Sequence, residues 1–176
     1  RQRQMCIRDR YSGMRIGEIC ALKWSDIDLQ SGIIRISKTV QRINDKIGNS
    51  KTKIIVGSPK SRTSEREIPI PNFLVNILNE RRQNENNYIL SGTHKLIEPR
   101  TMQNRFKSVL KKCGIRNVNF HLLRHTYATV CIENGFDAKT VSELLGHSNV
   151  NITLNRYVHS SLDTKKKYVE KLNFVA

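Results

Sequence analysis

Apolar residues recur at helical spacing in several separated stretches of the chain. Between residues 14 and 24, Ile16, Ile19 and Leu22 fall on one side of a short predicted helix that carries Arg15 at its start. The same period returns after Pro71, and further helices are expected at residues 73–78, 101–113, 119–134, 137–145, 148–157 and 162–172. Most of the second half of the chain is therefore predicted to be helical.

A strand-like pattern separates the first two predicted helices. Three short runs rich in β-branched residues, at residues 33–36, 53–56 and 65–70, predict three strands. Gly57 and Pro59 lie between the last two runs, so we expect a hairpin turn there with Lys60 projecting from it. The predicted class is α+β and mainly helical, with a small three-stranded antiparallel sheet packed on a helical bundle.

The charge balance adds a class of partner to this picture. The 176 residues include 31 Lys and Arg against 15 Asp and Glu, a formal net charge of +16, while 38% are hydrophobic, which is enough for one core. So positive a surface is expected to bind a polyanion, and nucleic acid is the first expectation. Charge alone leaves an enzyme and a simple binding protein equally open.

We expect one domain over residues 11–176. Residues 1–10 are polar and basic without clear periodicity, and we interpret them as a leading segment that need not belong natively to that domain. The four cysteines stand singly, so structural zinc and thioredoxin-like redox chemistry are not expected. No stretch is long and apolar enough to span a bilayer, and a cytoplasmic location is expected.

The run His-Leu-Leu-Arg-His is the most informative local motif. At helical spacing His121, Arg124 and His125 project from one side of a helix, which offers a proton carrier beside a guanidinium group. A surface helix with incidental basic residues would look the same, and a zinc site lacks the glutamate of a zincin helix and a third ligand. Downstream, His147 follows a predicted helix end in Leu-Leu-Gly-His, and Tyr157 lies near the close of the next helix.

Taken in order, these motifs resemble the tyrosine recombinase and phage integrase family from residue 11 to about residue 167. The matching residues are Arg15 in Gly-Met-Arg-Ile-Gly-Glu, Lys60, His121 and Arg124 in His-x-x-Arg, His147 in Leu-Gly-His, and Tyr157 ten residues later. The resemblance implies an integrase-like catalytic domain that breaks and rejoins DNA site-specifically through a 3′-phosphotyrosine intermediate. It also implies an amino-terminal DNA-clamping domain that these residues do not include.

The resemblance assigns the nucleophile and the phosphate clamp. Tyr157 would attack the phosphodiester, with Tyr168 as a rival of the same type. Arg15 and Arg124 would bind the nonbridging oxygens with bidentate, permanently charged donors. Glu18, one helical turn after Arg15, is expected to orient neighbouring side chains. This chemistry requires no metal or nucleotide cofactor.

The resemblance also assigns the proton transfers. Lys60 would protonate the departing 5′ oxygen, although Lys51 and Lys53 compete with it. His121 would assist proton transfer, and His147 would hydrogen-bond the phosphate. The remaining histidines, His125 among them, are expected to be structural or surface residues.

The expected partner is double-stranded DNA, bound by a homotetramer on paired sites that exchanges carboxy-terminal segments, in a prokaryotic or phage-encoded, nucleoid-associated system. Further basic residues are expected to touch backbone phosphates: Arg62, Arg66, Lys107, Lys111 and Lys112. Two alternative functions stay open: type IB topoisomerase-like DNA relaxation and non-enzymatic DNA binding. The covalent intermediate distinguishes the enzymes from the simple binder.

Overall fold

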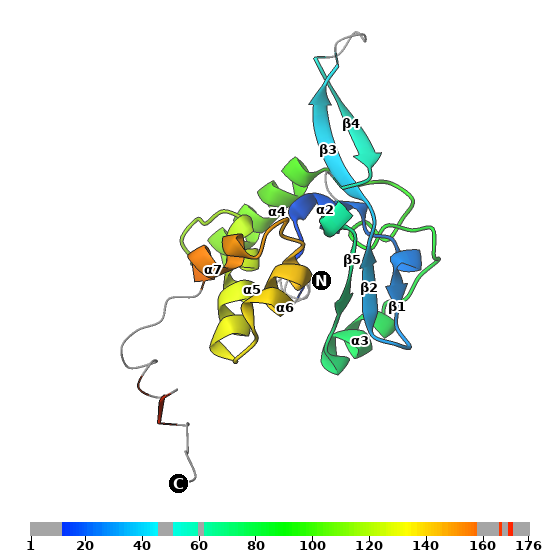
Figure 1. The fold of residues 1–176 in the computed structure, drawn as a ribbon. Coiled ribbons are helices and arrows are strands. Elements are labelled where there is room, and N and C mark those ends of the chain that lie inside the picture. Colours follow the sequence, from blue (N-terminus) through cyan, green and yellow to red (C-terminus); the bar gives the residue numbers. More distant parts are fainter. Residues whose placement is uncertain (1–11, 46–50, 60–61, 158–165, 167–168, 171–176) are drawn as a thin grey trace.

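The computed structural model describes residues 12–45, 51–59, 62–157, 166 and 169–170 (Figure 1). Lys60 and the predicted helix at 162–172 fall wholly or largely outside these residues. The elements follow in the order α2 (Ile16–Ala21), η1 (Trp24–Asp26), β1 (Ile27–Asp28), β2 (Ile33–Ile36), β3 (Thr39–Asn44), β4 (Thr52–Gly57), η2 (Arg62–Ser64), β5 (Arg66–Pro69), α3 (Asn72–Asn79), α4 (Pro99–Lys112), α5 (His121–Glu133), α6 (Ala138–Leu145) and α7 (Asn151–Tyr157).

Two separate antiparallel sheets form in place of the single predicted sheet. One has the strand order β1-β2-β5, and the other is the β3–β4 hairpin, which extends away from the helices (Figure 1). The prediction that the strands at 53–56 and 65–70 flank a hairpin is wrong, because β4 pairs with β3 and β5 pairs with β2. In β3 the one buried side chain is Val40, so this strand lacks the apolar alternation by which strands are recognised.

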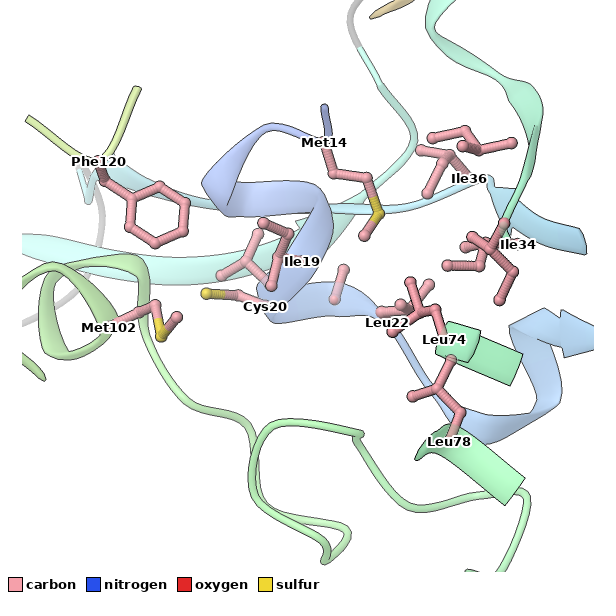
Figure 2. Packing of buried hydrophobic residues seen from close by; sticks show 14 of the residues in the cluster. Met14, Ile19, Cys20, Leu22, Ile34, Ile36, Leu74, Leu78, Met102 and Phe120 are labelled. Carbon is pink, nitrogen blue, oxygen red and sulfur yellow. The ribbon is translucent and has the colours of Figure 1, made fainter. Parts of the chain in front are cut away.

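The main core surrounds the short helix α2. Figure 2 shows Ile19 of α2 between Met102 and Phe120 on one side and the cluster around Ile34 and Leu74 on the other. These side chains are 0–5% exposed. Burial on several sides therefore fixes a helix of only six residues, which would not persist in isolation.

Gly17 allows α2 to approach the neighbouring strand β3. A Cβ at this position would lie 2.6 Å from Thr39 Oγ1 and 2.7 Å from the carbonyl oxygen of Val40. The carbonyl oxygen cannot retreat easily, because it belongs to the backbone of a paired strand. The second glycine of the Gly-Met-Arg-Ile-Gly-Glu motif thus has a packing reason, and it helps to place Arg15 at the start of α2.

A second apolar cluster joins α5 and α6. Ala128, Cys131, Val141 and Leu145 are buried in it, and Tyr157 of α7 packs against them. The five helices from α3 to α7 confirm the helical periods predicted between residues 73 and 157. In the described part of the chain, no helix is long and apolar enough to cross a membrane.

Polar side chains cap the starts of α6 and α7. Asp137 caps α6 by accepting from the backbone N–H of Thr140 at 2.9 Å. At the start of α7, the side chain of Asn149 accepts from the backbone N–H of Asn151 at 2.8 Å. Both residue types cap well, and α7 begins later than its periodicity indicated.

Candidate active site

Three arginines from separate elements meet at the carboxyl end of α6. The carbonyl oxygens of residues 144, 145 and 146 accept, in that order, from Arg66 Nε at 2.7 Å, Arg124 Nη2 at 2.6 Å and Arg15 Nη2 at 2.8 Å. The last carbonyls of a helix have no intrahelical donor and carry the negative end of its dipole. The end of α6 therefore holds the three guanidinium groups beside one another.

Gly146 shapes this end of the helix. It adopts a left-handed φ of +64°, and the following backbone N–H, that of His147, turns back to the carbonyl oxygen of Ser142 at 3.0 Å. A Cβ at Gly146 would lie 3.0 Å from Arg66 Nη1 and 3.0 Å from the carbonyl oxygen of Thr63. The glycine of the Leu-Gly-His motif is thus required by its φ and by the close approach of Arg66.

Glu18 is the acidic centre of this cluster. Its carboxylate, 2% exposed, accepts from the Arg15 backbone N–H at 2.8 Å, from Arg15 Nη1 at 2.9 Å and from Arg66 Nη2 at 2.9 Å. Burial by itself would raise the pKa of Glu18, but the hydrogen bonds and positive charge of Arg66 and Arg15 bring that pKa below its usual 4.5. Glu18 is ionised and fixes the orientation of both guanidinium groups.

The position of Arg66 corrects a prediction. We expected this residue to contact DNA phosphates, but its side chain is 6% exposed and donates to Glu18 and to the carbonyl oxygens of Leu144 and Ser64. All three nitrogens of its guanidinium group donate inside the protein, and Nη1 and Nη2 donate to the Glu18 carboxylate, which neutralises the charge. Arg66 therefore connects β5, α2 and α6 and acts as a structural ion-pair partner.

Arg124 is the most deeply placed of the three arginines. It is 3% exposed, and besides residue 145 it donates from Nη1 to the carbonyl oxygen of Gly13 at 2.8 Å. Burial, followed by the positive charges of Arg15 and Arg66, lowers the pKa of Arg124 to about 9, so it stays charged at neutral pH. Arg15 is 39% exposed, and it opens the cluster to solvent.

Two of the predicted histidines border the arginines. His147 follows Gly146, and its Nδ1 lies 2.9 Å from the hydroxyl of the buried Thr153. Burial and the positive charges of Arg124 and Arg15 lower its pKa to about 4. Burial, the neighbouring His125 and Arg124 also lower the pKa of His121. Both imidazoles are therefore neutral at neutral pH.

Tyr157 reaches the same cluster from α7. Its Oη lies 2.5 Å from Nδ1 of His125, and the two rings are tilted with their centroids 5.7 Å apart. Burial raises the pKa of Tyr157, and Arg124 acts against this increase, which places the phenol within electrostatic reach of the arginines. The contact with His125 was missed, because we expected this histidine to be structural or on the surface.

The structure thus brings together five of the six residues predicted for the site, from α2, α5, α6 and α7 and the segments that flank them. The sixth, Lys60, lies outside the described residues, as does the side chain of Arg62. Lys107, Lys111 and Lys112 are exposed on α4. Among the described residues no three His, Cys, Asp or Glu side chains gather in a way that could hold a metal ion.

This arrangement is suited to binding and stabilising an anion. Fixed guanidinium groups lie near neutral imidazoles and a phenol, and Glu18 supplies one negative charge among Arg15, Arg66 and Arg124. Donors that are already oriented stabilise negative charge without further reorganisation. A phenol beside such donors can attack an electrophile that they bind.

Several named proteins are similar in sequence to this chain over most of its length. The family model described as "Phage integrase family" matches residues 5–163. A protein named "Tyrosine recombinase XerC-like" from Caldanaerobacter subterraneus subsp. tengcongensis is 36% identical, over 92% of this chain and 46% of its own length. "Tyrosine recombinase XerA" from Thermococcus onnurineus is 29% identical, over 93% of this chain and 52% of its own. The chain spans about half the length of these prokaryotic relatives.

Solved structures show the same fold. The integrase of the transposon Tn1549, in complex with transposon right end DNA, superposes with a TM-score of 0.77 at 22% identity, over 97% of this chain and 58% of the other. The crystal structure of XerA recombinase gives a TM-score of 0.65 at 24% identity, over 98% and 59%. The fold is therefore integrase-like, mainly helical with small antiparallel sheets. Together with the family match over residues 5–163, this shows that the chain belongs to the phage integrase family.

Proposed function

We propose that this chain is the catalytic part of a tyrosine-type site-specific DNA recombinase. The observation that carries the proposal is the meeting of Arg15, Arg124 and His147 at one helix end, with the Tyr157 phenol beside them. Family membership supports the proposal, as do relatives named tyrosine recombinases and the similar structure of the Tn1549 integrase, which was solved in complex with DNA. The net charge of +16 suits a polyanionic substrate.

The proposed reaction is a pair of transesterifications. Tyr157 Oη attacks the scissile phosphorus and gives up its proton to a histidine of the site, and the bond from phosphorus to the 5′ oxygen breaks, which leaves a 3′-phosphotyrosine. Arg15 and Arg124 stabilise the charge on the nonbridging oxygens, and His147 donates a hydrogen bond to them. The departing 5′ oxygen takes a proton, for which we propose Lys60 as donor. A 5′ hydroxyl from the partner strand then reverses the steps and rejoins DNA.

A covalent-adduct assay tests this function. We expect the chain to form a covalent complex with a nicked suicide duplex that carries its recombination site, because loss of the short 5′ fragment prevents religation. Tyr157→Phe is expected to abolish the complex. Tyr168→Phe is the matched control, since it removes the rival phenol and is expected to leave the complex intact. A complex that persisted in Tyr157→Phe would overturn the assignment of the nucleophile.

The finer proposals concern assembly on DNA. We infer a homotetramer on paired double-stranded sites, with exchange of carboxy-terminal segments, on the strength of the family resemblance. Deletion of residues 162–176 is expected to impair the paired-site complex much more than binding to one site, as measured by gel shift. Equal loss in both complexes would argue against exchange. The exposed Lys107, Lys111 and Lys112 on α4 remain proposed phosphate contacts.

A further inference from the structure

The phenol of Tyr157 has a histidine partner that the family resemblance did not supply. Nδ1 of His125 lies 2.5 Å from Tyr157 Oη. His125 belongs to α5, directly after Arg124 and four residues after His121, so it stands on the helix that supplies two other residues of the site. Within the described hydrogen bonds, His125 and not His121 reaches the phenol oxygen; His121 instead meets the His125 ring edge-on, with centroids 4.6 Å apart.

The direction of this hydrogen bond follows from the charge state of the two groups. Burial and the positive charges of Arg156 and Arg124 lower the pKa of His125 below 6.5, so its imidazole is neutral at neutral pH. Burial raises the pKa of Tyr157, so its phenol keeps the proton. A neutral imidazole has one nitrogen that accepts. The phenol therefore donates its O–H to Nδ1, and the imidazole proton is assigned to Nε2.

We propose that His125 is a catalytic residue, whose Nδ1 orients the Tyr157 phenol and takes its proton during attack on DNA. The proposal rests on the function proposed above. In the cleavage step the bond from Oη to phosphorus forms, the phenolic proton moves to Nδ1, and the bond from phosphorus to the 5′ oxygen breaks. The leaving oxygen is protonated by a separate acid, proposed to be Lys60. In the rejoining step the His125 imidazolium returns its proton to Oη as the phosphotyrosine bond breaks.

The charges around His125 keep its imidazole neutral without DNA, and a bound phosphate would offset the charge of its imidazolium. Arg124 and His121 stand beside it on α5, and Arg156 and Tyr157 face it from α7. Without DNA, the positive charges of Arg156 and Arg124 favour the neutral imidazole that attack requires. The bound phosphate adds negative charge next to the ring, which offsets the new positive charge on His125 during the reaction. His125 is thus neutral before the attack, and its protonated form is stabilised after the attack.

The leaving group provides a test that separates the base, His125, from the acid, Lys60. The full chain is assayed for covalent complex on two nicked suicide duplexes, one with the ordinary 5′ oxygen and one with sulfur at that bridging position. A thiolate leaves without a proton, so sulfur rescues the loss of an acid but not the loss of a base. We expect His125→Ala to cleave about 10²- to 10⁴-fold more slowly on both duplexes, with unchanged DNA affinity. Lys60→Ala is expected to recover on the sulfur duplex.

Conservative and distant variants complete the test. His125→Asn places an amide oxygen near the position of Nδ1, where it can orient the phenol but cannot hold its proton, so we expect only partial recovery over His125→Ala. His94→Ala, at an exposed position, is expected to cleave like the parent chain. Circular dichroism and DNA binding of each variant separate slow chemistry from misfolding.

The outcomes that overturn the proposal are distinct. A His125→Ala variant that cleaves within about threefold of the parent chain, or that sulfur rescues, removes His125 from the attack on phosphorus. A His125→Asn variant that reaches the parent rate reduces it to an orienting residue. If the parent chain itself forms no covalent complex on its site, the proposed function fails, and the histidine is not the cause.

Discussion

The substitution Glu18→Gln removes one negative charge and keeps the shape of the side chain. Glu18 and Arg66 are 2% and 6% exposed and lie 2.9 Å apart, so the change leaves a buried guanidinium group without its counter-ion. Loss of one member of a buried ion pair costs about 3–5 kcal/mol of unfolding free energy. We expect about 3 kcal/mol, the lower end, because the carbonyl oxygens of Leu144 and Ser64 still accept from Arg66.

The control is an ion pair of the same residue types on the surface. Glu67 pairs with Arg35 at 3.1 Å, but the two side chains are 58% and 60% exposed. Glu67→Gln is therefore expected to cost less than about 1 kcal/mol. Urea unfolding followed by circular dichroism measures both costs, and Glu18→Gln should lower the midpoint far more at equal slope. If the two variants unfold at the same midpoint, the buried ion pair contributes no more to stability than the exposed one.

Lowering the pH should reduce the difference in unfolding free energy between the parent chain and Glu18→Gln. The folded-state pKa of Glu18 is lower than 4.5, its value in the unfolded chain, so the stability it contributes is present above pH 4.5 and is lost as the pH falls through the folded-state pKa. Glu18→Gln lacks this contribution at every pH. The unfolding free energies of the parent chain and of Glu18→Gln should therefore converge on acidification, and parallel curves would contradict the ion-pair explanation.

Four other measurements probe the rest of the site. Gly13→Ala should lower Tm more than Gly135→Ala. Both glycines have a positive φ, +60° and +85°, but only at Gly13 would a Cβ meet the Tyr127 ring, at 2.6 Å, which adds about 1–3 kcal/mol of overpacking. Equal Tm values for the two variants would contradict this. Arg124→Lys should slow covalent-complex formation about 10²- to 10³-fold, because an ammonium group cannot reproduce the paired contacts, and a near-parent rate would argue against the clamp. Since the pKa of His147 is lowered to about 4, the folded chain resists its protonation, so stability should fall as pH drops from 6.5 towards 4, and this fall should be shallower in His147→Asn. DNA affinity should decrease steeply with salt in a titration, and a flat profile would contradict a phosphate-dominated interface.

Helices could be predicted from the sequence where one face is buried. The period in α4 matches Met102, Phe106 and Val109, all of which are buried. Strand β3 carried no such signal, since Val40 is its one buried residue, whereas β4 could be predicted from its β-branched residues at 53–56. Strand pairing could not be predicted from the sequence pattern either, because the strands at 53–56 and 65–70 follow one another along the chain but pair with different strands.

The site residues could be predicted by type and order, but their contacts could not. The three arginines donate to main-chain carbonyl oxygens, and since every residue has one, the amino-acid sequence does not indicate which of them an arginine contacts. Arg66 looked like a surface cation, because nothing near it in sequence shows that Glu18 lies 2.9 Å away. His125 lacked a predicted role for the same reason: its partner Tyr157 is 32 residues further along the chain.

The carbonyl oxygens that hold the arginines belong to the polypeptide backbone and exist whichever amino acid occupies positions 144 and 145. A saturation library over these two codons should therefore keep the guanidinium groups docked, provided that position 145, which is fully buried, stays apolar. Codon 146 should tolerate little besides glycine. Side chains at positions 144 and 145 can thus change while the main-chain oxygens that hold Arg66 and Arg124 keep their places.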